Sequence, residues 1–563
     1  MAIANLSTAL TSATSGLRAS QATIDTISRN IANAQTDGYT RKIIELRNIV
    51  SDRAGGGVDL VEPIRKVDSF LQKDGLAETA RTAALSVKDT YLTQLQEVFG
   101  RPNDNTTISA QLNELQQAFD SLVVNPTDPT QQRLVLAEAD RVCQMFRQLT
   151  TSVQAMRTQA DTEIANAITQ VNADLTKIAE LNGAIGLQKQ SGHSSADLED
   201  QRDQLIREVN EQLGVRYFER DPQTGQYGIM TEGSRFIVDV APISLNYFTP
   251  VNAAPVTLPI VAPGTTTPIV SGTPIVSAVH QYLPPDGVTT FSAGKLVNLG
   301  SVYALVGGQY IDIKSEIASG KIAGLFELRD TILPEAQAQL DQIAAAIAIG
   351  FQNTDIFNAT GTNVTAATEI EVFHNSAGPP SYLPTATFAG TAAAEVGFAG
   401  RIAVNSVFTA DPWRIVHGTN VATTPTEPTL NGDITRLQRV QQLFENPNPP
   451  GAYPSVPPYV PPFQNKMFPN FSVNGLPAQN TLEGAAASFV GYQSQSKADI
   501  EDRLDAQKAL SDALNTRLKS DSGVNTDEEL ALMIQMQNSY GASARVVTTV
   551  NRLFDELLAI AGR

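Results

Sequence analysis

The sequence predicts an α+β multidomain protein with terminal coiled-coil-like helices, an elongated helical bundle and inserted β-rich domains. Both ends carry an apolar stripe at helical spacing, and residues 69–213 repeat such stripes. After residue 214, stretches rich in Pro, Thr and Gly interrupt the helical pattern. With 563 residues, the chain is longer than one hydrophobic core usually serves, so several domains are expected.

Apolar residues near both chain ends alternate three and four positions apart, starting from Ile3 and from Leu530. This spacing places them on one narrow face of an α-helix, as in a coiled coil. The rest of each helix is largely polar, so neither helix can bury its stripe alone. We therefore predict an assembly seam made of Leu6, Leu10, Leu17, Ile24, Ile27, Ile31, Met533, Tyr540, Val547, Phe554 and Leu558.

The charges of the two ends are complementary. Residues 1–50 carry more basic than acidic side chains, and residues 525–563 carry more acidic than basic ones. This favours pairing of the two ends, although weakly, because an exposed ion pair contributes only ~0–1 kcal/mol.

After the first helix, residues 43–50 and 57–66 have the composition of extended strands, with Gly55–Gly57 as the turn between them. A helical region follows from about residue 69 to 213. Within it, Asp128 and Pro129 are a favourable N-cap and first-turn pair. The apolar stripe from Val142 to Ile178 is long enough for a rod-like bundle.

The pattern changes at Gly214, where residues 215–219, 226–231 and 234–239 read as strands joined by tight turns. Residues 240–285 contain no charged side chain, and we expect strands and loops there. Helices return at 317–351 and 481–520, residues 358–421 have a β-like composition, and residues 447–469 are a proline-rich connector.

These elements suggest a nested organisation in which the ends pair and the middle is inserted. The predicted units are a terminal helical assembly domain (1–50 with 525–563), a helical bundle (51–213 with 480–524), a β-rich domain (214–316), a helix packing back on the bundle (317–357), a second β-rich outer domain (358–446) and a Pro-rich connector (447–479).

Composition limits the possible functions. The net charge of −18 argues against a nucleic-acid binder, which needs a basic face. One cysteine, Cys143, excludes an intrachain disulfide and a multi-cysteine metal site, and we expect it to be buried. The longest apolar run, residues 343–349, is too short for membrane insertion. We predict no catalytic, cofactor or metal site, because the four histidines are scattered and no nucleotide or hydrolase motif is present.

The segment that ends the first helix carries the strongest motif, residues 30–41 (NIANAQTDGYTR). Gly38 suits the positive φ of a turn or helix C-cap. With its key residues Asn30, Asn33, Gly38, Tyr39 and Arg41, this segment resembles the N-terminal signature of the bacterial flagellar rod, hook and hook-associated axial proteins. Residues 522–558 resemble the signature at the other end of that family.

Internal segments resemble the hook-associated protein 1 branch of this family, which forms the hook–filament junction. They are residues 125–129 (NPTDP), 198–205 (LEDQRDQL) with 213–215, and 322–330 (IAGLFELRD). We interpret the carboxylates of residues 198–205 as a solvated helix face or as ion pairs of Arg202 and Arg207. The resemblance covers roughly residues 1–240, 310–355 and 480–563.

The resemblance implies a structural subunit of the flagellum that joins the hook to the filament and is needed for filament assembly. Its implied partners are the hook protein, a second junction protein, flagellin, further copies of itself in a ring, and a cytoplasmic export chaperone at the C-terminal helix. No secretory signal is visible, and composition alone would suggest a cytosolic protein. The resemblance implies instead an extracellular flagellar protein that is exported without a cleaved signal peptide. The alternatives are another axial protein, of the hook or distal rod, and a secreted wall-degrading enzyme, which would need a carboxylate pair in the β region.

Overall fold

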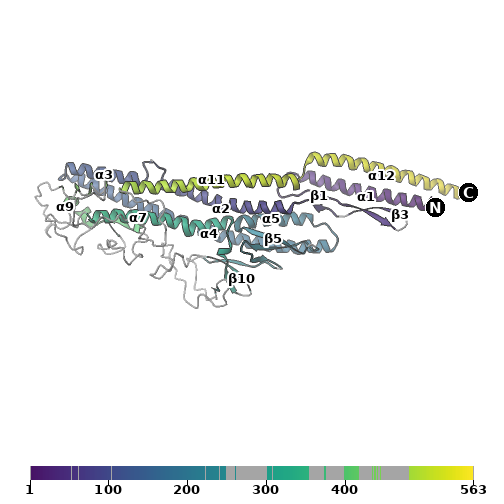
Figure 1. Cartoon of the computed structure of the whole chain (residues 1–563), viewed down its shortest axis with the longest axis horizontal. Helices are drawn as coiled ribbons and strands as arrows, with labels where there is room; N and C mark the ends of the chain where they lie inside the picture. Colours follow the sequence, from purple (N-terminus) through teal and green to yellow (C-terminus); the bar gives the residue numbers. More distant parts are fainter. Residues whose placement is uncertain are drawn as a thin grey trace.

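The computed structural model describes residues 2–51, 54–60, 62–102, 104–221, 223–239, 241–248, 260–261, 301–306, 309–353, 373–375, 398–417 and 481–561, together with 434, 437, 438, 440, 441 and 444. These residues form a long rod that is mostly helical (Figure 1). Both chain ends lie at the same tip of the rod, where α1 (Ala2–Ala32) and α12 (Thr526–Ala561) run side by side. We call α1 and α12 the terminal helix pair.

The body of the rod is a bundle of long helices, which we call the bundle. Its helices are α2 (Ser69–Phe99), α3 (Ile108–Val124), α4 (Pro129–Gln190), α5 (Ala196–Leu213) and α11 (Leu482–Ser522). Capping residues fix where they begin, because side chains at Asp68, Thr107, Asp128 and Thr481 accept hydrogen bonds from the first-turn amides. The prediction for Asp128 and Pro129 is thus confirmed.

Apolar side chains along α4 make the bundle's core. The predicted stripe from Val142 to Ile178 is buried except for Met145, which is half-buried, and Cys143 is fully buried beside it, as expected. At the far end, the rings of Phe99 and Phe489 are 4.8 Å apart and join α2 to α11. The chain returns to the bundle through α6 (Gly320–Glu327), a π-helical turn (Leu328–Ile332) and α7 (Leu333–Asn353), which together confirm the helix predicted at 317–351.

Small sheets flank the bundle. The three strands predicted after Gly214 are confirmed as the antiparallel sheet β5 (Val215–Asp221), β6 (Gln226–Thr231) and β7 (Phe236–Val238). A second sheet, in the order β8-β10-β11-β9, contains β8 (Leu245–Phe248), β9 (Ile260–Val261), β10 (Ser301–Val306) and β11 (Gln309–Asp312).

The region that follows α7 contains a strand pair and short helices. They are β12 (Phe373–Asn375), a 3-10 turn (Phe398–Gly400), β13 (Ile402–Val404), α8 (Ser406–Ala410) and α9 (Arg414–His417). Another 3-10 turn, Lys314–Glu316, precedes α6. The two helices lie where a β-like composition suggested strands. The connector predicted at 447–479 and most of residues 240–285 and 358–397 lie outside the described residues.

Two short ribbons lie beside the terminal helix pair, one at its bundle end and one along α1 (Figure 1). One pairs β1 (Lys42–Ile43) with β4 (Ile64–Arg65), and the other pairs β2 (Leu46–Ser51) with β3 (Ala54–Leu60). The prediction of a turn at Gly55–Gly57 is wrong, because these glycines lie inside β3. Gly57 (φ +94°) is needed there for close approach to α1, since a Cβ would lie 2.3 Å from Ser15 Oγ.

Candidate assembly site and its joint with the bundle

The two terminal helices run antiparallel and contact each other along much of their length (Figure 1). Small residues allow this close approach. Ser20 Oγ lies 3.4 Å from Ser539 Oγ, and a Cβ placed on Gly16 would lie 3.4 Å from Ser543 Oγ. The two ends of the chain therefore share one interface within a single subunit.

The predicted seam residues are distributed between this interface and its edges. Ile27 is buried, Tyr540 is exposed, and the side chain of Leu558 lies outside the described residues. The remaining members are half-buried: Leu6, Leu10, Leu17, Ile24, Ile31, Met533, Val547 and Phe554. Their role in contacts between subunits stays a prediction.

The interface also uses residues of α12 that the predicted stripe omitted. Glu529 is 1% exposed and Val550 is 6% exposed, whereas Leu530 is 49% exposed. The positions that face α1 keep the predicted three-four spacing, but some of them lie one residue before the predicted position, as Glu529 does relative to Leu530. The sequence alone hardly distinguishes the two patterns, because Met533 and Val547 belong to both.

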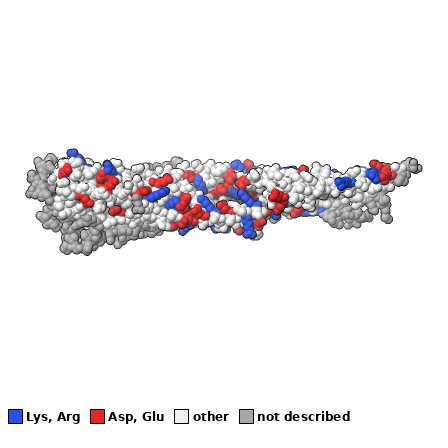
Figure 2. Space-filling view, turned by 90° about the horizontal axis from the view of Figure 1, so that it is seen from above, with Lys and Arg blue, Asp and Glu red and all other residues white. Residues whose placement is uncertain are grey.

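Apolar side chains remain exposed on the sides of α12 that face away from α1. They are Leu530, Leu532, Ile534, Val546 and Leu553, with Ile534 exposed to 60%. Figure 2 shows that charged side chains of both signs gather over the middle of the rod, while much of the terminal helix pair is uncharged on this face. The pair thus keeps apolar surface that no described residue of its own chain covers.

Asn30 organises a buried polar cluster at the inner end of the terminal helix pair. Its Nδ2 donates to the Lys42 carbonyl (2.9 Å) and to Glu529 Oε2 (3.0 Å), and its Oδ1 accepts from the Lys42 amide (3.1 Å). Arg41 Nε donates to Glu529 Oε1 at 2.7 Å. We call Asn30, Tyr39, Arg41, Lys42 and Glu529 the motif lock, because they bind α1, β1 and α12 into one unit. The predicted attraction between the oppositely charged ends is realised here.

The other motif residues shape the chain between α1 and β1. Tyr39 Oη donates to Asn30 Oδ1 at 3.0 Å, and Asn33 Nδ2 donates to the Arg29 carbonyl at 2.9 Å at the end of α1. Gly38 has φ +80°, which confirms the predicted positive φ, and a Cβ there would lie 2.4 Å from Arg207 Nη2. A side chain at position 38 would therefore be strained by its backbone, and the tip of the Arg207 side chain would have to move aside.

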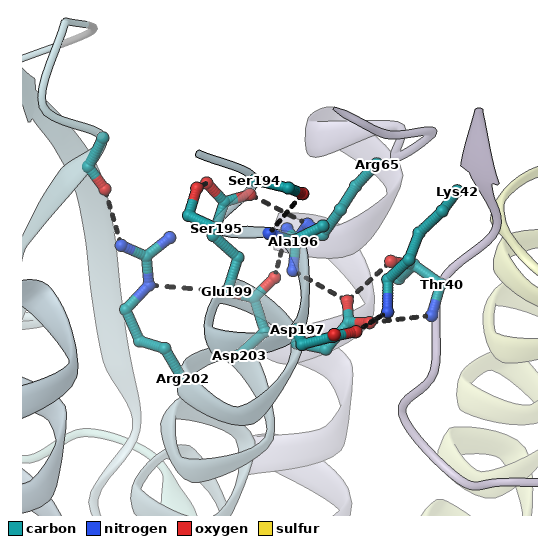
Figure 3. Close-up of polar contacts among 12 residues, drawn as sticks. Thr40, Lys42, Arg65, Ser194, Ser195, Ala196, Asp197, Glu199, Arg202 and Asp203 are labelled. Carbon is teal, nitrogen blue, oxygen red and sulfur yellow. Dashed lines mark hydrogen bonds and ion pairs between the residues drawn. The ribbon is translucent and has the colours of Figure 1, made fainter. Parts of the chain in front are cut away.

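A second polar cluster fastens the β1–β4 ribbon to the first turns of α5 (Figure 3). Asp200 lies at its centre, because Thr40 Oγ1 donates to Asp200 Oδ1 at 2.6 Å and Arg65 Nη1 donates to the same oxygen at 3.0 Å. Lys42 Nζ is 3.4 Å from Asp200 Oδ2 and also pairs with Asp197. We call Thr40, Lys42 and Arg65, with Asp197, Glu199, Asp200 and Asp203, the α5 latch.

Arg65 makes the widest set of contacts in the α5 latch. Besides Asp200, its guanidinium pairs with Asp203 at 2.7 Å and with Glu199 at 3.2 Å. Burial disfavours its charge, but Asp203 and the other carboxylates outweigh this and raise the pKa of Arg65. Burial likewise raises the pKa of Asp200 above its ordinary value, and the contacts with Thr40, Arg65 and Lys42 do not fully offset it.

These contacts correct the interpretation of residues 198–205 as a solvated face. Glu199, Asp200 and Asp203 are largely buried, and their main partners are Arg65, Lys42 and Lys189. Of the predicted arginine ion pairs, that of Arg202 is present, with its Nε 3.8 Å from Asp203 Oδ1. Arg202 also lies against the Tyr227 ring, 3.4 Å from its centroid, and donates to the Gly225 carbonyl. The segment therefore connects three parts of the chain.

The end of α11 completes the joint between the terminal helix pair and the bundle. The Ser522 carbonyl accepts from the Arg41 amide at 2.9 Å, and Ser522 Oγ accepts from the Asp68 amide at 3.3 Å. Gln72 Nε2 on α2 donates to Asp203 at 2.9 Å. The joint therefore collects α2, α5, α11 and the β1–β4 ribbon at one level of the rod.

The arrangement serves contact and positioning. Among the described residues, no group of three or more His, Cys, Asp or Glu side chains is placed to hold a metal ion, and no helix is long and apolar enough to cross a membrane. The fold and the site define an elongated protein whose two chain ends form one partly apolar helix pair on a polar joint.

Comparisons with known proteins agree with this class. Residues 92–367 match, in two overlapping stretches, the family described as flagellar hook-associated protein FlgK helical domain. Residues 10–40 match the flagella basal body rod protein family, and residues 520–560 match the flagellar basal body rod FlgEFG protein C-terminal family.

Curated relatives extend the likeness to the whole chain. Flagellar hook-associated protein 1 of Escherichia coli (strain K12) is 24% identical over 598 residues, which cover 99% of this chain and 100% of that protein. The protein of the same name from Salmonella typhimurium is 24% identical over 609 residues, with the same coverage. The Bacillus subtilis protein is 27% identical over 221 residues, 37% of this chain and 43% of its own.

Among solved structures, the flagellar hook junction protein FlgK from Burkholderia pseudomallei is similar to 54% of this chain and 46% of its own, at 18% identity and a TM-score of 0.39. The sequence matches cover both terminal segments and the central helices. The chain belongs to the flagellar hook-associated protein 1 family. It is a structural component of the flagellar axis.

Proposed function

We propose that this protein is the subunit that joins the hook to the filament, acts without catalytic activity, and is required before flagellin can polymerise. The observation that carries the proposal is the terminal helix pair. It brings the two family signatures into contact within one helix pair and leaves Leu530, Ile534 and Val546 exposed on its surface. Exposed apolar surface of this kind marks a contact with another protein.

In the proposed assembly, copies of this chain form a ring through their terminal helix pairs. The hook protein lies on one side of the ring, and a second junction protein followed by flagellin lies on the other. The bundle supplies lateral contacts and the β-rich domains face outward. The predicted division of the chain into domains is part of this proposal, with the seam residues of α1 and α12 contributing to the contacts between subunits.

Export is proposed to proceed without a cleaved signal peptide, with a cytoplasmic chaperone on α12 until the chain leaves the cell. The exposed apolar residues of α12 would otherwise promote aggregation. A chain that ends at Ser522 lacks α12 but keeps the bundle. It should no longer retain the chaperone in a pull-down, and unchanged retention would place the chaperone site elsewhere.

The proposed function can be tested with a charge on the exposed stripe. Ile534→Asp leaves the isolated subunit intact, because the side chain is 60% exposed and the new carboxylate stays solvated. If neighbouring subunits cover this position, the carboxylate becomes buried and unpaired, which costs several kcal/mol at every contact. Ile534 separates contacts between subunits from contacts within one subunit better than Val547 does, because Val547 already lies half-buried in the subunit's own interface.

Cells producing Ile534→Asp should carry hooks without filaments and release flagellin into the medium. Asn538→Asp is the matched control, since it adds the same charge on the outer side of α12, on the next helical turn. Normal filaments on Ile534→Asp cells, with normal export of the variant, would contradict the proposed role of this stripe.

A further inference from the structure

Two of the sheets have an open strand edge where they face α4. β8 is the outermost strand of its sheet, and β10 is the described strand that pairs with it. β6 lies in the middle of its sheet, but its pairing with β7 stops at Ile229, so Tyr227 lies beyond the end of β7. Backbone N–H and C=O groups that lose contact with water at such edges need other hydrogen-bond partners. At both places α4 supplies the partner.

Asn172 closes the edge of β8. Its Nδ2 donates to the Leu245 carbonyl at 2.7 Å, and its Oδ1 accepts from the Leu245 amide at 2.8 Å. The neighbouring Ser244 carbonyl instead accepts from the Leu305 amide in β10, so successive backbone groups of this segment alternate between β10 and α4. A carboxamide carries one acceptor and one donor side by side, as the backbone of an adjacent strand does. One side chain thus occupies the place of a strand.

Asn182 makes the same contact with β6. Its Nδ2 donates to the Tyr227 carbonyl at 2.8 Å, and its Oδ1 accepts from the Tyr227 amide at 3.1 Å. The same oxygen accepts from Arg202 Nη1 at 3.2 Å. Because a guanidinium can only donate, Arg202 keeps the amide oxygen on its own side and so fixes which way the amide faces. Asn182 is 6% exposed, so water does not compete freely for these bonds.

The two asparagines serve different sheets from one helix, about 15 Å apart along the axis of α4. The apolar side chains of Leu245, Ile229 and Ile237, all at most 2% exposed, hold the sheets against the bundle. Burial of apolar surface leaves the polar backbone groups beside it without partners, and each such group destabilises the fold. The asparagines supply those partners at the two open edges.

We propose that Asn172 and Asn182 are main-chain clamps, each of which takes the place of a strand at the open edge of one sheet and holds that edge closed against α4. Loss of a clamp leaves one N–H and one C=O without their partners, so the edge opens locally while the bundle stays folded. Because each clamp contacts one sheet, Asn172 controls the opening of β8 and Asn182 that of β6. This inference concerns the subunit itself and does not rest on the proposed function.

Native-state amide exchange on the full chain tests both clamps. Asn172→Leu keeps roughly the size of the side chain and removes both its donor and its acceptor. The loss of two hydrogen bonds should accelerate exchange in peptides of residues 244–248 by roughly 30-fold, with wild-type rates in 226–231 and in 142–156 of α4. Asn182→Leu should give the reverse pattern, with acceleration in 226–231. Asn166→Leu is the matched control, because it places the same substitution on α4 at an exposed position, and it should leave all three regions unchanged.

Three results would overturn the proposal. Exchange in residues 244–248 of Asn172→Leu no faster than in Asn166→Leu would show that the asparagine does not hold the edge. Acceleration of both sheets in either variant would show that they open together, through the contact in which the Ile243 amide donates to the Ile237 carbonyl at 2.8 Å. Acceleration in residues 142–156 as large as in the sheet would show that the side chain supports the bundle as a whole.

Discussion

Glu529 offers the most informative perturbation of the terminal helix pair, because its neighbour supplies a matched control. Glu529 is 1% exposed and accepts from Arg41 Nε at 2.7 Å and from Asn30 Nδ2 at 3.0 Å. Glu528 contacts the same arginine at 3.4 Å, but its side chain is 61% exposed. Glu529→Gln and Glu528→Gln therefore remove the same charge from the same pair of helices at very different burial.

The magnitude follows from these contacts. Breaking a buried ion pair costs about 3–5 kcal/mol, and a hydrogen bond to a charged group is worth about 1.5–3 kcal/mol. Glutamine keeps one acceptor for Asn30, and Glu528 remains close to Arg41, so Glu529→Gln should fall at the lower end, at about 2 kcal/mol. The exposed pair of Glu528 should contribute only ~0–1 kcal/mol.

Native-state amide exchange measures this difference where it arises. A loss of about 2 kcal/mol should accelerate exchange in peptides of α1 and α12 by roughly 30-fold in Glu529→Gln, and by only a few-fold in Glu528→Gln. Peptides from the middle of α4 should keep wild-type rates in both variants, because the motif lock does not contact them. Equal effects of the two variants, or acceleration in α4 as large as in α12, would refute the assignment of the motif lock.

Three further outcomes are expected. Gly324→Ala should lower the free energy of unfolding by about 1–3 kcal/mol, because its Cβ would lie 2.6 Å from the Ala84 carbonyl oxygen where α6 crosses α2; denaturant titration against Gly491→Ala, which meets nothing within 4 Å, measures this cost. Glu199→Gln should reduce the loss of stability on the acid side of the pH–stability curve. Burial opposes ionisation of Glu199, but Lys189 and Arg65 lower its pKa below the ordinary value of 4.5. The ionised carboxylate therefore stabilises the fold above pH 4.5, and this stabilisation is lost as the pH falls further. Chemical unfolding at a series of pH values checks the sign, and an unchanged acid side would contradict it. Cys143 should react with a thiol reagent at neutral pH only as fast as the bundle opens, because burial raises its pKa to about 12; rapid reaction of the native chain would place it at the surface.

Local patterns in the sequence were sufficient for the helices and for part of the sheets. Three-four spacing located both terminal helices and the buried face of α4, and turn residues located β5, β6 and β7. The glycines at 55–57 misled, since they lie inside β3 and Gly57 serves close approach to α1 rather than a turn. Periodicity is a property of a single helix, so it predicts which face of that helix is apolar.

The joint could not be predicted in the same way, because its partners are distant in the chain. Thr40 and Asp200 are separated by 160 positions, and Arg41 and Glu529 by 488. A run of acidic residues such as 197–203 is most often solvated, and only the fold brings Arg65 and Lys42 against it. Likewise, an acidic residue is rarely assigned to a buried helix seam, so Glu529 was missing from the predicted one. The motif residues Asn30 and Tyr39 pointed to this region through resemblance, without revealing their contacts.

The central claim is that this chain forms the connection between hook and filament. It is tested most directly by electron microscopy of isolated flagella, with a gold-labelled epitope inserted at Gly192 in the exposed turn between α4 and α5. Label is expected in one narrow band where the hook meets the filament, and cells that lack the protein should carry hooks without filaments. Label along the hook or at the rod, or normal filaments in its absence, would contradict the claim.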